Sequence, residues 1–245
     1  TPAALEAVVV AAGLTPIRDP SNDNPRFARV RLRQAFADPA GEGAGTQALA
    51  EAAGAFAQRR ARLEAALLAR LAQAAEIRPE AYAWIDPVAL GQDEVSAMAL
   101  ARLVGLIGGA AWPIASTDAA ALRARGHGSL GGAWLRPAAR GRWLLVRDPG
   151  LIAPRQPLTP PLFWDGRFRV QGPARPGWHC GALGEAAGRF KNRGVSPITA
   201  LRALPALWDA EGMLAVVPGL FYREASDRDC WRFAFLPRGG ALPVA

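Results

Sequence analysis

Apolar residues recur at every third or fourth position along several stretches of this chain, which is the spacing of a helix with one buried face. The longest stretch predicts a helix over residues 47–75, with one side formed by Leu49, Ala53, Phe56, Leu63, Leu67 and Leu71. The same spacing predicts shorter helices over residues 1–13, 93–107, 116–125, 183–190 and 196–201.

Strands are expected where short apolar runs flank a turn. Residues 132–147 predict a hairpin, residues 162–170 a second one around Asp165-Gly166, and residues 206–217 a third. A last strand is expected over residues 230–236 and a short one over residues 14–17. The chain therefore has the pattern of a mixed protein, part α/β and part α+β.

Two segments rich in glycine or proline divide the chain into three predicted domains. Residues 38–45 read Asp-Pro-Ala-Gly-Glu-Gly-Ala-Gly and predict a flexible hinge, and residues 154–161 carry the prolines of a stiff linker. The predicted domains are residues 1–37, 46–153 and 160–245. We expect the central domain to be largely helical with one β-hairpin, and the last to be a small α+β domain.

Composition excludes several classes of protein. With 245 residues and 51% hydrophobic content, the chain can bury a sizeable core, which excludes a disordered protein. Two cysteines cannot form the disulfide framework of a small secreted domain, and we find no signal peptide, so a cytoplasmic protein is expected. The longest apolar region, residues 97–115, contains Arg102 and Pro113 and indicates a core helix with a loop, not a membrane span.

The net charge of the chain indicates which class of partner it binds. The formal net charge of +8 and the isoelectric point near 11.0 favour an anionic partner, and nucleic acid is the commonest large one. Nearly all of this charge is arginine, because Lys191 is the only lysine. Since arginine can accumulate through compositional drift, its placement is more informative than its number.

The most informative placement is in residues 17–33. Residues 19–22 read Asp-Pro-Ser-Asn and predict a turn. Arg26, Arg29 and Arg33 follow at the spacing of one helix face, with apolar side chains expected beneath them at Phe27, Val30 and Leu32. A cationic face at a helix N-terminus suits a phosphate group, but a solvated arginine face is an equally good alternative.

Further basic positions are candidates for contact with RNA. In the hairpin of residues 132–147, four arginines interleave with Trp134 and Trp143, namely Arg136, Arg140, Arg142 and Arg147. Arg189, Lys191 and Arg193 form a compact basic cluster after the helix predicted over residues 183–190. We select Arg136, Arg142, Arg189, Lys191 and Arg193 as candidate RNA-binding residues. In the alternative, the tryptophans cover the protein core and the arginines simply alternate outward.

No self-contained active site is visible. The two histidines, His127 and His179, have no partner at the spacing of a catalytic device. With Cys180 and Cys230 they show none of the spacing of a zinc site, so no metal site is expected.

The arginine-rich stretch resembles an element of the tRNA(Ile)-lysidine synthetase family. The matching positions are Asp19, Ser21, Asn22, Arg26, Arg29 and Arg33. Val30 stands where many family members have asparagine, so no polar role is carried over to it. The resemblance continues through residues 130–132 (Leu-Gly-Gly), 163–168 (Phe-Trp-Asp-Gly-Arg-Phe) and 204–208 (Leu-Pro-Ala-Leu-Trp), and so covers essentially the whole chain.

This resemblance implies a fold for the first residues. In the family, the matching element closes an ATP-pyrophosphatase domain, so residues 1–37 are expected to be the C-terminal end of such a Rossmann-like domain. The family's nucleotide loop, Ser-Gly-Gly-x-Asp-Ser, does not occur in this chain, and neither does a Walker-type loop. We therefore expect the chain to be the C-terminal part of a longer enzyme, with no ATP-binding motif of its own.

The resemblance also implies an activity. Family members are ligases that use ATP, with Mg²⁺, to attach lysine to C2 of the wobble cytidine in an isoleucine tRNA with a CAU anticodon. Arg29 and Arg33, and less directly Arg26, would stabilise nucleotide or tRNA phosphates, while Asp19, Ser21 and Asn22 would order the loop. A homodimer is left open. The alternatives are a stand-alone basic RNA-binding module without catalysis, or a basic surface that contacts only other parts of its own protein.

Overall fold

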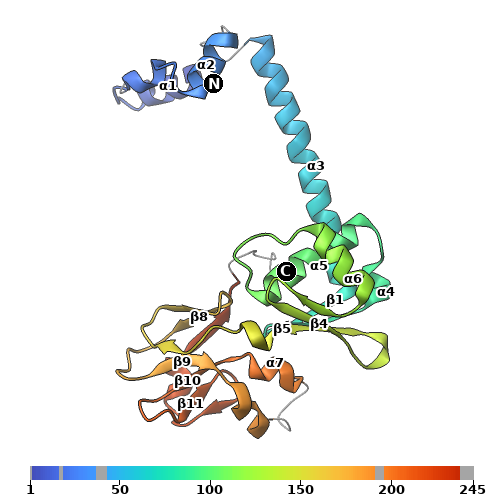
Figure 1. The fold of residues 1–245 in the computed structure, drawn as a ribbon. Helices are drawn as coiled ribbons and strands as arrows, with labels where there is room; N and C mark the ends of the chain where they lie inside the picture. The colour runs from blue at the N-terminus through green and yellow to red at the C-terminus, as the bar shows by residue number, and fades with distance from the viewer. Residues whose placement is uncertain (1, 17–18, 37–42, 191–195, 238–245) are drawn as a thin grey trace. The chain divides into compact units, whose positions relative to one another are not determined.

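The computed structural model of the chain describes residues 2–16, 19–36, 43–190 and 196–237 (Figure 1). Its internal contacts divide the chain into two compact units, residues 1–64 and residues 65–245. The division falls inside the longest helix, α3 (Ala44–Ala74). The mixture of helices and antiparallel sheets agrees with the predicted mixed class. The Rossmann-like tail and the three domain ranges stay predictions.

Helices and turns make up the described part of residues 1–64. The elements are α1 (Pro2–Ala11), the 3-10 helix η1 (Pro20–Asp23), α2 (Ala28–Phe36) and the first part of α3. Helix α1 confirms the helix predicted over residues 1–13, and Gly13 follows it with a φ of +70°, as is usual after a helix. Residues 14–16 form no strand, so the strand predicted there is wrong at these positions; the described residues of this unit offer it no partner strand.

Helix α2 buries one of the three apolar side chains expected beneath its arginines. Val30 exposes 3% of its surface, whereas Phe27 exposes 45% and Leu32 57%. Phe27 precedes the first residue of α2, and Leu32 lies about 200° around the helix from Val30. The three residues therefore cannot share one buried face, and the prediction is wrong for Phe27 and Leu32.

Helix α3 confirms the helix predicted over residues 47–75, but its apolar side is buried only near its end. Leu49 and Phe56 expose 56% and 69% of their surface, while Leu67 and Leu71 are buried in the core of residues 65–245. The end of α3 therefore belongs to that core.

The first sheet of residues 65–245 is antiparallel and five-stranded, in the order β1-β2-β5-β4-β3. Its strands are β1 (Ala75–Arg78), β2 (Tyr82–Ile85), β3 (Gly128–Leu130), β4 (Ala133–Pro137) and β5 (Trp143–Arg147). The same region contains α4 (Pro87–Leu90), α5 (Glu94–Gly108), α6 (Ser116–Arg125) and the short 3-10 helices η2 (Ala139–Gly141) and η3 (Pro149–Leu151). The predicted hairpin of residues 132–147 is confirmed as β4 and β5, but it forms the middle of a sheet. The expectation of a single hairpin in this region is thus corrected.

Helix α5 covers one face of this sheet. It starts where Asp93 accepts a hydrogen bond from the Ser96 N–H at 2.8 Å, and it ends at Gly109, whose φ is +67°. Its buried side packs with α3, α6 and the inner sheet face, in a cluster that includes Ala99, Leu103, Ile107, Leu122, Leu135 and Leu145.

Two further antiparallel sheets follow. One has the order β12-β11-β10-β9-β6, and the other β13-β8-β7. The strands are β6 (Gln156–Pro157), β7 (Leu162–Trp164), β8 (Phe168–Gln171), β9 (His179–Ala182), β10 (Pro205–Trp208), β11 (Leu214–Val217), β12 (Phe221–Tyr222) and β13 (Arg232–Phe235). Between them lie the 3-10 helix η4 (Gly184–Phe190), α7 (Ile198–Arg202) and α8 (Asp227–Cys230).

Both hairpins predicted in this region are confirmed. In the first, Asp165 and Gly166 adopt φ angles of 54° and 66°, the positive values that a two-residue hairpin turn needs. The second hairpin consists of β10 and β11, and the predicted last strand is β13. The sheets share one core with buried side chains at Trp164, Leu183, Leu207, Val216 and Trp231.

A buried ion cluster joins the first sheet to the hairpin of β7 and β8. From the end of β5, Arg147 donates to both carboxylate oxygens of Asp165, through Nε at 3.0 Å and Nη2 at 2.8 Å. Arg167 donates to the same carboxylate through Nε at 2.8 Å, and to the Ala203 carbonyl at 2.9 Å. The Ala153 N–H is a further donor to Asp165 at 2.8 Å.

This cluster carries more positive than negative charge. Arg167 is fully buried, and among the described residues its Nη1 has no hydrogen-bond partner. Burial, together with the nearby charge of Arg147, lowers the pKa of the Arg167 guanidinium to about 10. Asp165 is therefore the single carboxylate between two buried guanidinium groups. Asp165 and Arg167 of this cluster belong to residues 163–168, one of the motifs noted in the sequence.

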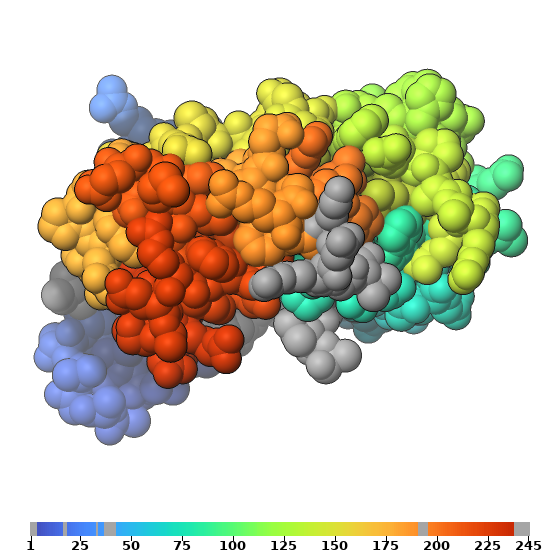
Figure 2. Space-filling view, turned by 90° about the horizontal axis from the view of Figure 1, so that it is seen from below, coloured from blue at the N-terminus to red at the C-terminus, as the bar shows by residue number. Residues whose placement is uncertain are grey.

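Helix α7 lies on the second face of the first sheet. Its Ala200 packs against Tyr82, Leu144 and Val146, all of which are buried. In the space-filling view, the orange segment that contains α7 meets the yellow-green segment that contains β4 and β5 (Figure 2). Helix α7 thus covers part of this sheet face, on which Trp84, Trp134 and Arg136 are still partly exposed.

Candidate nucleic-acid interface

The strand register places several basic and aromatic residues of the first sheet on the face that α7 covers, while Trp143 and Arg147 of β5 belong to the other face. One row across the strands consists of Glu76, Trp84, Leu144 and Arg136, which pair in that order. A second row lies two residues away along each strand. In it Arg78 pairs with Tyr82, and Trp134 pairs with Val146. Because alternate strand positions point to the same side, both rows belong to one face.

Two guanidinium groups on this face stack over indole rings. The Arg136 guanidinium lies 4.9 Å from the centroid of the Trp134 ring, and that of Arg142 lies 5.4 Å from the centroid of Trp84. A guanidinium above an aromatic ring is attracted by the ring and can still donate hydrogen bonds to phosphate oxygens. We name Trp84, Trp134, Arg136 and Arg142 the arginine–tryptophan rim.

Glu76 limits the charge of this rim. It accepts from Arg78 at 3.0 Å and from Arg142 at 3.2 Å, and all three side chains are partly exposed. Exposed pairs of this kind are weak, with about 0–1 kcal/mol each, so a phosphate can compete for the guanidinium groups.

The structure sorts the arginines of the predicted hairpin into different places. Arg136 and Arg142 both belong to the rim, whereas Arg140 is exposed in the turn. Arg147 is buried in the ion cluster, so the expectation that it alternates outward with the others is wrong. Its guanidinium also donates to the carbonyls of Gly108 and Gly132, at 2.7 and 2.8 Å, which leaves it no role in binding a partner.

The remaining basic candidates are only partly described. Arg189 is exposed on η4, which packs against α7. Lys191 and Arg193 lie outside the described residues.

In residues 1–64, side chains and backbone together hold the predicted turn. Asp19 accepts a hydrogen bond from the Ser21 N–H at 2.8 Å, and its carbonyl accepts from the Asn22 N–H at 3.0 Å. The Ser21 hydrogen bonds, with a contribution from the Arg29 charge, lower the pKa of the Asp19 carboxyl. Asn24 accepts from the Arg26 N–H at 3.0 Å, a contact that the sequence analysis missed.

The arginines of this element divide into structural and exposed ones. Arg31 donates to the Pro25 and Arg26 carbonyls, at 2.9 and 2.8 Å, and so fastens the turn to α2. Arg26 precedes α2 and is exposed, while Arg29 is exposed on α2 with its guanidinium 5.5 Å from the Phe27 ring centroid. Arg33 also belongs to α2.

Asn24 and Arg31 were missed for different reasons. Asn24 precedes a proline, and asparagine before proline favours the start of a turn, so this signal was available. Arg31 looks like any other arginine in a basic run, and only the folded turn shows which carbonyls it reaches.

The described residues offer little for metal or nucleophile chemistry. Among them, no three His, Cys, Asp or Glu side chains lie close enough to hold a metal ion. Burial raises the pKa of the Cys180 thiol to about 12, which keeps it protonated and inert. Within the same residues, no helix is both long and apolar enough to cross a membrane.

An arginine-rich chain with guanidinium groups stacked on indoles, and with further exposed arginines beside a turn, is typical of proteins that bind nucleic acid. The comparison with known proteins is more specific. The chain is 30% identical over 229 residues to the tRNA(Ile)-lysidine synthase of Ruegeria pomeroyi, an alignment that covers 86% of this chain and 52% of that protein. The resemblance predicted from the sequence is thereby confirmed, and the chain spans about half the length of this relative. No family model matches the chain.

Proposed function

We propose that this chain is the tRNA-binding part of a ligase that forms lysidine in an isoleucine tRNA. The observation that carries the proposal is the 30% identity to a tRNA(Ile)-lysidine synthase, extending over most of the chain. In the proposed reaction, the C2 oxygen of the wobble cytidine of a tRNA with a CAU anticodon attacks the α-phosphate of ATP, and pyrophosphate leaves. The lysine amine then attacks C2, and AMP leaves with that oxygen.

This chain would bind tRNA and supply positive charge to phosphate groups, whereas the nucleotide-binding loop is not part of its sequence. Its sequence contains neither the Ser-Gly-Gly-x-Asp-Ser loop nor a Walker-type loop, so no residue here is assigned to hold Mg²⁺ or lysine. Its contribution toward ATP or tRNA phosphates would come from Arg29 and Arg33 of α2, with Arg26 beside them. The exposure of Arg26 and Arg29 supports this role, because an exposed guanidinium is available to a phosphate oxygen.

The arginine–tryptophan rim would hold tRNA through phosphates or unpaired bases. Arg136→Gln and Arg142→Gln should each weaken tRNA binding and reduce by about 1 the slope of log affinity against log salt concentration. Arg169→Gln is the control, because Arg169 is an exposed arginine on β8, in a different sheet. If the slope of log affinity against log salt concentration were unchanged in both variants, the rim would not contact tRNA phosphates.

Lysidine formation by the complete enzyme tests the role of the arginine-rich stretch that contains Arg29 and Arg33. Arg29→Ala and Arg33→Ala should lower lysidine formation far more than they lower the melting temperature, because phosphate contacts act on the reaction. Arg62→Ala, an exposed arginine on α3, should change neither. If both α2 variants lost activity and stability to the same extent, Arg29 and Arg33 would have a purely structural role.

A further inference from the structure

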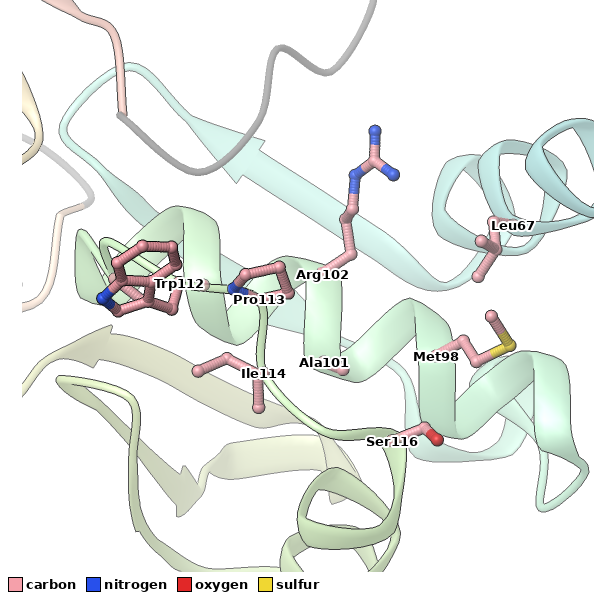
Figure 3. A pocket seen from close by; sticks show the side chains of 10 residues that line it. Leu67, Met98, Ala101, Arg102, Trp112, Pro113, Ile114 and Ser116 are labelled. Carbon is pink, nitrogen blue, oxygen red and sulfur yellow. The ribbon is translucent and has the colours of Figure 1, made fainter. Parts of the chain in front are cut away.

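A hollow with a cavity volume of ~340 Å³ opens beside α5 in residues 65–245 (Figure 3). Leu67 and Met98 line one end of it, and Trp112 and Pro113 line the other. Arg102 and Ser116 are the polar residues among those that line it. The volume is at the lower end of the range for small-molecule sites, ~300–1,000 Å³, and suits a single ring system with one polar group attached.

The walls of this hollow are fixed by close packing. Ile114 lies so close to Gly131 that a Cβ built on that glycine would be 2.4 Å from the Ile114 Cδ1. On the α5 side, a Cβ on Gly105 would be 3.7 Å from Ile114, which is ordinary contact. Ile114 is thus held between α5 and the turn before β4, and the hollow is formed before any ligand arrives.

Trp112 is the unusual residue of the hollow. It exposes 81% of its surface, although a tryptophan is large and usually mostly buried. The αL conformation of Gly109 on one side and the fixed φ of Pro113 on the other restrict the short loop that carries it. An exposed indole offers a flat apolar surface, as recognition sites for ring systems do.

We propose that this hollow accepts one unpaired nucleotide of the RNA substrate. The base would stack on Trp112 and bury its edge against Pro113 and Ile114, while its phosphate would lie beside Arg102. The charge favours this occupant over a peptide segment, since the hollow carries an arginine in a chain of net charge +8. The inference rests on the proposed function, because it requires an RNA partner.

Two RNA probes test it with the whole 245-residue chain. One is a short blunt RNA duplex, and the other is the same duplex with a single-stranded extension. Trp112→Ala should weaken binding of the extended duplex by roughly 5- to 150-fold, which corresponds to the ~1–3 kcal/mol of one base–aromatic stack, and leave the blunt duplex unaffected. Trp112→Phe should retain most of the affinity. Val88→Ala is the control, because Val88 is 88% exposed on α4 outside the hollow.

The outcomes separate this inference from the proposed function. A photoreactive thiouridine in the extension should cross-link to the peptide that contains Trp112. Equal effects of Trp112→Ala on both probes, or no effect on either, would overturn the nucleotide site while leaving RNA binding intact. A change in self-association without a change in RNA binding would overturn it in favour of a protein contact. Failure of the wild-type chain to bind either probe would overturn both proposals.

Discussion

Replacing Asp165 by asparagine should strongly destabilise residues 65–245. The carboxylate accepts four hydrogen bonds at 2.8–3.0 Å, from Arg147, Arg167 and the Ala153 N–H. Asparagine has the same shape and tolerates the positive φ of 54° at this position, so the substitution changes the charge without straining the turn. Two buried guanidinium groups would then face each other with no counter-charge.

The size of the effect follows from this imbalance. Removing one partner of a buried ion pair typically costs ~3–5 kcal/mol, because the remaining charge is left in a poorly solvating environment. Arg167→Met should cost less, although Arg167 is fully buried, because it leaves Arg147 and Asp165 as a matched pair. Glu185→Gln should cost below about 1 kcal/mol, since Glu185 is 87% exposed in its pair with Arg202.

Urea unfolding followed by tryptophan fluorescence measures these differences. Urea is uncharged and does not screen the ion cluster, and all eight tryptophans lie at or beyond Trp84, so the signal reports on residues 65–245 alone. A loss below about 1 kcal/mol for Asp165→Asn would show that the two buried guanidinium groups do not depend on this carboxylate. An equal loss for Arg167→Met would refute the part that rests on net charge.

Two further predictions concern titrating groups. The hydrogen bonds from Arg70 and from the Ser96 N–H lower the pKa of Asp93 from 3.8 to about 2. These hydrogen bonds therefore stabilise the folded chain fully above pH 3.8, the pKa of the unfolded chain, and the stabilisation is lost as the pH falls through about 2. Between these pH values the melting temperature of the wild type should therefore fall more steeply than that of Asp93→Asn; parallel curves would contradict this assignment. Cys230 is exposed and should react with iodoacetamide in the native state, whereas buried Cys180 should react only after unfolding, which peptide mass spectrometry can check. Equal native labelling of both thiols would show that the core around β9 is open.

Elements with strong local signals could be predicted from the sequence. The helix of residues 47–75 has a long periodic pattern, and the Asp165-Gly166 turn specifies a hairpin by its own backbone preference. Strands β1 and β3 could not be found this way, because they are four and three residues long and contain alanine or glycine. Their pairing depends on neighbours that are distant in the sequence.

Burial on both faces also concealed part of the candidate site. In β2, Tyr82, Ala83 and Ile85 are all buried, because α5 covers one face of the sheet and α7 the other. A strand covered on both faces shows no alternation, so Trp84 was not recognised as the partner of Arg142. Arg136 and Arg142 of the rim are candidates from the sequence, and their role in binding stays a prediction. The tryptophan beneath Arg142 is Trp84, not the Trp143 of its own hairpin.

Arg147 shows the corresponding limit for charged residues. In sequence it is one of four similar arginines in a hairpin, and alternation alone suggests exposure. Its buried position depends on Asp165, which lies 18 residues further along the chain and comes close only when the second hairpin folds. Arginine identity therefore predicts charge, while tertiary structure decides whether that charge is available to a partner.

The most direct test of the account is tRNA binding by this chain across a salt series. An isoleucine tRNA with a CAU anticodon would be compared with an unrelated tRNA of similar length. If the chain is the tRNA-binding part of such a ligase, it should prefer the isoleucine tRNA even at moderate salt, because specific contacts are added to general phosphate attraction. Weak binding of both tRNAs to the same extent, lost together as salt rises, would contradict it and leave the chain with nonspecific attraction only.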